Sequence, residues 1–396
     1  MLYLIFDALR GWLDGVGLYG VFGLLDQVQF RALAGAGLAF AIVLLLGRRV
    51  IAALLRLKIG DPGMTDAEAL RTVSAGKANT PTMGGLLIVG AALVVTLVLA
   101  DISTRWVQLA VVVMVWMAVL GGVDDWLKLT ASRRGVKSRQ GLYAWEKLVF
   151  QLGCGLVVGY FAYAAGITGA PVEAAHTLNL PFQKTYDTGT PTRELSSSLI
   201  VLTMPMYVLV ATLMVAGMSN AVNITDGMDG LAAGISGVVA LGTLALALIA
   251  GTQSWAQTLL VPYVPGTAEL AVVAGALGGA CLGFLWFNCS PAQVFMGDTG
   301  ALCLGGMIGF LAVATRQEFV VLLMCGVCLA EIGSVVVQVG CFKLTGGHPN
   351  GRRVFRVAPY HHHLHLGGWT EQQVVVRFWI VTAVLTVIAL ASIKVR

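Results

Sequence analysis

Ten apolar runs, each close to the length that crosses a bilayer, dominate this chain. An α-helix needs about 20 apolar residues to span the hydrocarbon core, and in lipid every backbone polar group must find a partner within the protein. Only 11% of the 396 residues are charged, against about 25% in soluble domains. The sequence therefore predicts an all-α integral membrane protein of about ten transmembrane helices. The runs are 28–47, 83–101, 105–123, 147–167, 197–217, 230–250, 268–288, 298–315, 319–342 and 373–393.

The polar connections contain no repeat and no segment that reads as a soluble domain, so we expect one polytopic domain over residues 1–396. Residues 1–27 are apolar but interrupted by four charged side chains, which is typical of an interfacial segment ahead of a core at 28–396. In the segment 166–196, Thr177–Leu180 precede a proline and predict the start of a small external hairpin.

Lys and Arg gather in alternate loops. If the loop 48–82 is placed inside, the basic loops share its side, and the opposite loops carry few cations. The positive-inside rule then makes this side cytoplasmic and places both termini outside. No basic segment interleaved with aromatic residues is present, so nucleic acid is not an expected partner and the lipid bilayer is. The inner loops are 48–82, 124–146, 218–229, 289–297 and 343–372.

The most polar stretch between two runs is Ser219–Leu231, which contains two Asn, two Asp and two Gly within eleven residues. Carboxylate and amide oxygens are hard ligands suited to Mg²⁺, and glycine lets the backbone approach a ligand closely. Taken alone, the stretch is equally typical of a polar turn between helices. Because other polar loops fall on the same predicted side, we favour a binding site.

Two further acidic positions belong to that side. Asp124 and Asp125 end the third run, where a helix C-terminus disfavours anions and adjacent carboxylates repel each other. We expect one to face a metal and the other a reactant, since neighbouring side chains on a helix diverge by about 100°. Asp298 begins the eighth run, where it could be a metal ligand or a helix N-cap.

Several other residues on the predicted inner side each have two possible roles. Lys77 could meet a phosphate or a lipid headgroup, and Phe295 could stack on a base or anchor the membrane interface. Residues 361–363 are three histidines, with His365 close behind; phosphate or sugar contact fits them better than zinc, for which no further ligand is placed. Glu331 lies inside the ninth run. An acid within a membrane span is either a functional residue or a hydrogen-bonding residue that shapes the helix.

Five segments carry a resemblance to a known family. They are TPTMGG at 80–85, DD at 124–125, NAVNITDGMDGL at 220–231, FNCSPAQVFMGDTG at 287–300 and APYHHH at 358–363. In this order and on one side of the membrane, they resemble the phospho-N-acetylmuramoyl-pentapeptide transferases, part of the polyprenyl-phosphate N-acetylhexosamine-1-phosphate transferase superfamily. The resemblance runs from about Phe30 to the C-terminus.

The resemblance implies a multi-pass enzyme of the bacterial inner membrane with an active-site cleft on the cytoplasmic face. It implies UDP-MurNAc-pentapeptide as donor, undecaprenyl phosphate as acceptor and Mg²⁺ as cofactor. The products would be lipid I and UMP, in peptidoglycan synthesis. A homodimer remains open.

The resemblance also implies roles by position, with Asp298 as the metal ligand. His365 departs from the family, which usually has Glu there. The implied catalytic residues are Asp124, Asp125 and Asp298, and the implied substrate-binding residues are Lys77, Lys128, Lys147, Asn223, Asp226, Asp229, Asn288, Phe295, His361 and His362.

Two other functions compete with this interpretation. One is a UDP-N-acetylglucosamine-1-phosphate transferase for another surface polymer, against which the APYHHH loop argues. The other is a cation-coupled transporter that uses Glu331 and the aspartates. Transporters place coupling acids near the bilayer midplane, whereas most acids here lie at the inner ends of the runs.

Overall fold

The computed structural model describes residues 2–56, 80–130, 141–166, 172–187, 194–347 and 351–393. Lys77, a predicted phosphate contact, lies outside the described residues.

Nine helices in these ranges are long and apolar enough to cross a membrane. They confirm the prediction of an all-α, multi-span membrane protein. The nine are α3 (Val28–Arg56), α6 (Arg105–Thr130), α7 (Ala144–Gly166), α9 (Met204–Thr225), α10 (Leu231–Gly251), α12 (Leu270–Asn288), α13 (Gly297–Ala314), α15 (Gly326–Leu344) and α17 (Glu371–Ser392).

The run predicted at 83–101 forms a shorter helix, α5 (Gly85–Leu99). Its 15 residues extend about 22 Å, less than the hydrocarbon core of about 30 Å. The helix starts late because the preceding residues pair with another loop: the Phe295 N–H donates to the Pro81 carbonyl and the Gly84 N–H to the Phe295 carbonyl, both at 2.8 Å. The second predicted run is therefore a short helix whose start is bound to the loop that carries Phe295.

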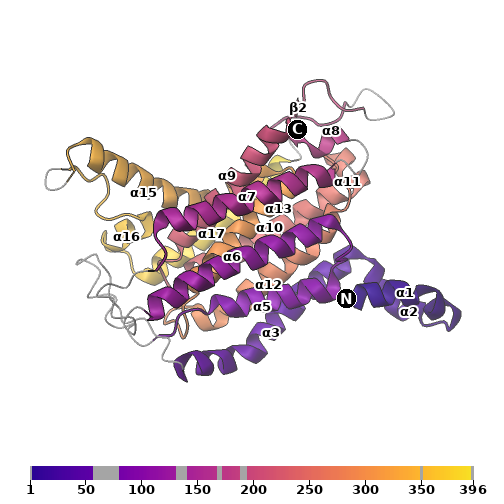
Figure 1. The fold of residues 1–396 in the computed structure, drawn as a ribbon, viewed down its shortest axis with the longest axis horizontal. Coiled ribbons are helices and arrows are strands. Elements are labelled where there is room, and N and C mark those ends of the chain that lie inside the picture. The colour runs from indigo at the N-terminus through magenta and orange to yellow at the C-terminus, as the bar shows by residue number, and fades with distance from the viewer. Residues whose placement is uncertain are drawn as a thin grey trace.

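The run predicted as a single span at 319–342 is two helices, α14 (Glu318–Met324) and α15. The break is at Cys325, whose ψ of 16° is not helical. After it, α15 diverges from the rest of the bundle (Figure 1). Helix α15 packs against the short helix α16 (Tyr360–His365), where Glu331 contacts His361.

The core is formed by α10, α12 and α13, the most buried of the long helices. Helix α13 packs against α6 and α9, and α12 against α3 and α10. At Gly305 and Gly309 of α13 the backbone of α9 comes so close that a side chain would collide with it. Small residues at such contacts let helix backbones touch in a membrane. The three helices that carry Asp124, Asn223 and Asp298 are therefore closely packed against one another.

The short elements gather mainly at one end of the bundle. The predicted hairpin is present as a minimal antiparallel pair in which Thr177 lies opposite Val201. Both chain ends lie toward α8 and α11, and α16 lies at the opposite end (Figure 1). Which end faces the cytoplasm remains a prediction, as does the interfacial position of residues 1–27. These elements are α1 (Leu2–Gly15), α2 (Tyr19–Phe22), η1 (Gly23–Asp26), α8 (Val172–Ala175), β1 (Thr177–Leu178), β2 (Ile200–Val201), α11 (Gln253–Leu259) and η4 (Thr267–Glu269).

Candidate active site

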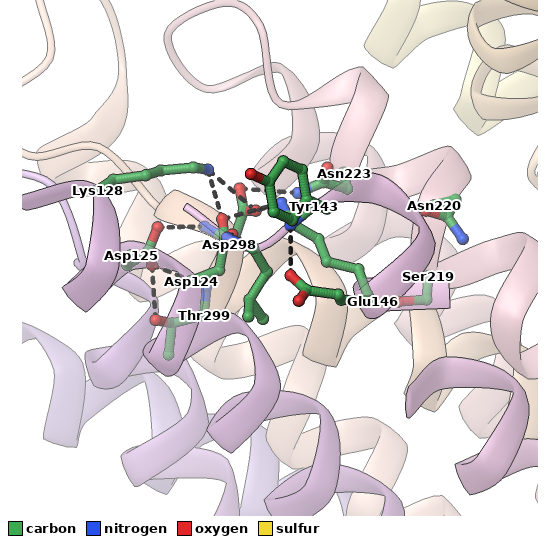
Figure 2. Close-up of polar contacts among 12 residues, drawn as sticks. Asp124, Asp125, Lys128, Tyr143, Glu146, Ser219, Asn220, Asn223, Asp298 and Thr299 are labelled. Atoms are coloured by element: carbon green, nitrogen blue, oxygen red, sulfur yellow. Dashed lines mark hydrogen bonds and ion pairs between the residues drawn. The ribbon is translucent and has the colours of Figure 1, made fainter. Parts of the chain in front are cut away.

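Three carboxylates from two helices meet at the centre of the site (Figure 2). Asp124 and Asp125 lie near the end of α6, and Asp298 lies in the first turn of α13. Each offers an oxygen within 4.8 Å of the others. Asp124 and Asp125 are buried, and the Asp298 side chain is 14% exposed. Two acidic segments far apart in the sequence thus form one cluster.

Two lysines neutralise part of this charge. The Lys128 Nζ lies 2.6 Å from an Asp124 oxygen and 3.1 Å from an Asp298 oxygen. The Lys147 Nζ contacts the same two oxygens at 2.9 and 2.6 Å. Two cations against three carboxylates leave a net negative charge when all are ionised, so the cluster can hold a further cation.

Asp125 has a different environment from its neighbour. Its oxygens accept hydrogen bonds from the Asp298 N–H at 3.1 Å, the Thr299 N–H at 2.9 Å and the Thr299 hydroxyl at 2.7 Å. The first N–H groups of a helix have no partner within that helix. Asp125 therefore caps α13 from the adjacent helix, and the Asp298 side chain is left to face the lysines.

The loop before α7 fixes the other side of the cluster. The Leu142 N–H donates to Asp124 at 2.7 Å, and the Tyr143 N–H donates to the Glu146 carboxylate at 2.7 Å (Figure 2). The second contact caps the start of α7, as a glutamate at the third helical position commonly does. Lys147, the next residue, is consequently held at the cluster.

The polar stretch that ends α9 and follows it supplies two neighbours of Asp298; the predicted loop 218–229 is helical up to Thr225. Asn223, in the last turn of α9, donates from its amide to Asp298 at 3.0 Å (Figure 2). Asp226 follows the end of α9; burial first, and then the charges of Asp298 and Asp125, raise its pKa to about 8. Burial and the charge of the cluster beside it therefore favour the protonated form of Asp226.

Asn288 holds the loop that leads to Phe295 in place through two hydrogen bonds. Its side-chain oxygen accepts from the Gly230 N–H at 3.0 Å, and its amide donates to the Val294 carbonyl at 2.8 Å. Phe295 itself is half-buried, so its ring has surface left for a ligand. In this arrangement Asn288 positions the aromatic residue and uses both of its polar atoms within the protein.

Asp229 braces the same loop from the other side. One of its oxygens accepts from the Ala292 N–H at 3.0 Å, and its own N–H donates to Glu371, at the start of α17, at 3.0 Å. Asp229 was predicted at the site from the sequence, but Glu371 was not. An acid in the first turn of a helix commonly stabilises that helix, so Glu371 did not stand out.

The histidine segment meets the turn after α9. His361 is buried and lies against Gly227, and the half-buried His362 ring is tilted on it with 4.2 Å between ring centroids. The Nδ1 of His365 is 2.9 Å from the Trp369 carbonyl. His365 therefore closes a turn after α16, at the position where the resemblance led us to expect a glutamate.

Comparison with known families agrees with this geometry. The pattern of the family "Glycosyl transferase family 4" matches residues 107–316, more than half of the chain. A second pattern, "Phospho-N-acetylmuramoyl-pentapeptide-transferase signature 1", matches residues 77–89.

The chain belongs to glycosyl transferase family 4. The family match encloses the carboxylate cluster, and the signature covers the segment that pairs with Phe295. Together they confirm the resemblance and support a phospho-sugar transferase with a nucleotide-sugar donor and a polyprenyl phosphate acceptor in the membrane.

Proposed function

We propose that the protein transfers phospho-MurNAc-pentapeptide from its UDP donor to undecaprenyl phosphate, forming lipid I and UMP in peptidoglycan synthesis. The observation that carries this proposal is that Pro81–Gly85, within the segment 77–89 that matches the signature, pairs with the loop of Phe295 directly beside the carboxylate–lysine cluster. The segment that matches the signature and the charged centre are thus parts of one site.

The charges suit the transfer of a phosphorylated group. A diphosphate brings negative charge that Lys128 and Lys147 can neutralise. The carboxylate oxygens of Asp124 and Asp298 lie close enough to hold one Mg²⁺, an ion that usually takes only one or two protein carboxylates and completes its shell with water and phosphate. We assign Asp298 as its main ligand, since it is the most exposed of the three. When bound, Mg²⁺ would supply further neutralisation of phosphate charge.

The acceptor reaches such a site from the membrane. Lys147 contacts the carboxylates, and the residues that follow it on α7, Leu148, Val149 and Phe150, are exposed at 44, 56 and 51%. An exposed apolar surface on a spanning helix faces lipid. A lipid with a phosphate head can therefore lie along α7 and present its phosphate to Lys147.

We infer that the acceptor attacks directly. An oxygen of the lipid phosphate forms a bond to the β-phosphorus of the donor, and the bond from that phosphorus to the bridging oxygen breaks, releasing UMP. The acceptor is a monoester with a second pKa near 6, so it is mostly a dianion at neutral pH and needs positioning more than activation. Asp124 is a weak alternative nucleophile because it is buried and bound by two lysines and the Leu142 N–H.

Isotope exchange tests the direct route. Purified enzyme freed of lipid is incubated with the UDP donor, Mg²⁺ and labelled UMP. Direct attack predicts no label in the donor until undecaprenyl phosphate is added. Exchange without lipid, lost in Asp124→Asn, would instead assign Asp124 as a covalent nucleophile.

Donor identity is tested by offering UDP-MurNAc-pentapeptide and UDP-GlcNAc separately with undecaprenyl phosphate. We expect UMP release with the first only. Turnover of UDP-GlcNAc alone would replace the proposed reaction with transfer of N-acetylglucosamine-1-phosphate.

A further inference from the structure

A buried acid lies in α15, away from the carboxylate cluster. Glu331 is fully buried, and its carboxylate accepts the backbone N–H of His361 at 3.1 Å and lies 2.9 Å from the Nδ1 of the same residue. A buried carboxylate is costly unless it is paired and hydrogen-bonded. Both of these contacts go to one residue, His361, on the adjacent helix α16.

The double contact fixes the imidazole. An ionised carboxylate only accepts hydrogen bonds, so Nδ1 carries the proton and the ring is held both at its backbone and at one edge. In a histidine, the hydrogen bond at one ring nitrogen sets the protonation and direction of the other. Glu331 therefore determines where the Nε2 of His361 points.

The Nε2 points at the turn that follows α9. A side chain at Gly227 would come within 2.7 Å of the His361 Cε1 and closer still to Nε2. The absence of a side chain at Gly227 therefore makes room for the ring between Asp226 and Asp229. Nε2 is buried, and no hydrogen-bond partner for it is found among the residues that the structure describes.

We propose that Glu331 is a positioning residue, which holds His361 so that Nε2 accepts a hydrogen bond from a sugar hydroxyl in the sugar-phosphate half of the nucleotide donor. The proposal rests on the proposed function. Leaving a buried polar atom unpaired is unfavourable, and a sugar hydroxyl of a donor bound over the Asp226–Asp229 turn would donate a hydrogen bond to it. We assign the base of the UMP half to stacking on the Phe295 ring. The His361 contact should therefore form with the intact donor and not with UMP alone.

A double-mutant cycle tests this coupling, with Glu331→Gln, His361→Ala and the double variant. A glutamine offers one acceptor oxygen where the glutamate offers two, so one of the two His361 contacts must be lost. We expect each single variant to lower kcat/KM about 10- to 100-fold, by analogy with groups that orient metal-bound histidines. The double variant should be no worse than His361→Ala, because Glu331 acts only through that residue.

Binding measurements supply a readout that a merely structural role would not move. Glu331→Gln should weaken binding of the intact donor and leave UMP affinity unchanged. Ser334→Ala is the matched control: Ser334 lies one turn further on α15 and its hydroxyl donates only to the Glu331 backbone carbonyl, so both affinities should remain those of the wild type. Gly227→Ala, which displaces the ring from the other side, should reproduce the selective loss if Glu331→Gln folds poorly.

Additive losses in the double variant, or equal losses of UMP and donor binding, would overturn the proposal. A failure of the proposed lipid I reaction would give a different result from a failure of the Glu331–His361 proposal. If the wild type turns over only UDP-GlcNAc, the lipid I assignment fails, and the same cycle measured with that donor still decides whether Glu331 acts through His361.

Discussion

The contact between α6 and α13 at Gly121 allows a quantitative test of how the cluster is held. A methyl group at this position would lie 2.6 Å from the Thr299 Cα and closer to the Asp298 carbonyl. Asp124 and Asp125 follow within about one turn of Gly121 on the same helix. Gly121→Ala therefore forces apart the two helices that bring the carboxylates together.

The required shift follows from the geometry. Ordinary contacts begin at 3.4 Å, so the Thr299 contact alone must open by about 0.8 Å. A displacement near 1 Å of a reacting group costs about 100-fold in rate. We expect Gly121→Ala to lower kcat/KM for lipid I formation about 100-fold while the protein still folds.

The adjacent glycine is the control. A methyl group at Gly122 would meet only the Thr299 hydroxyl, at an ordinary 3.7 Å, and Gly122→Ala makes the same change in helix propensity. Initial rates of UMP release and thermal unfolding in detergent are measured for both variants. Gly121→Ala activity within threefold of the wild type, or an equal loss in Gly122→Ala, would refute the reasoning.

Three further predictions concern single side chains. Asp298→Asn should abolish turnover and remove the Mg²⁺ dependence of nucleotide binding in titrations; retained metal dependence would assign the ion elsewhere. Phe295→Ala should weaken UDP-donor binding by about 1–3 kcal/mol, as for stacked bases in other proteins, and leave lipid affinity unchanged; unaltered donor binding would exclude stacking. Because the pKa of Asp226 is raised to about 8, its carboxyl is neutral below that pH and ionises above it, where it repels phosphate. UDP binding without Mg²⁺ should therefore fall above pH 8 in the wild type and not in Asp226→Asn; parallel pH profiles would contradict this.

Sequence patterns predicted the fold because spanning helices are defined by local apolarity. The late start of α5 depends on contacts with a distant loop, which an apolar run does not reveal. The apolar run at 319–342 does not reveal the break at Cys325 either. Both exceptions bear on the site: the first pairs Pro81 with Phe295, and the second brings Glu331 to His361.

The site was predictable where acidic residues were conspicuous among apolar ones, as with Asp124 and Asp298. It was not predictable where the partner is a backbone group or an ordinary polar residue. The N–H of Leu142 and the hydroxyl of Thr299 bind the aspartates, yet neither residue stands out in the sequence. Glu331 was recognised as unusual, but its partner could be identified only from the packing of α15 on α16.

The most direct test of the central claim follows the phosphorus that is transferred. UDP-MurNAc-pentapeptide labelled in its β-phosphate is incubated with purified enzyme, undecaprenyl phosphate and Mg²⁺, and lipid and aqueous phases are separated. We predict that the label moves into the lipid in equal amount to the UMP released, and that Asp298→Asn abolishes both. Label that stays in the aqueous phase while UMP is released would contradict the transfer to lipid phosphate.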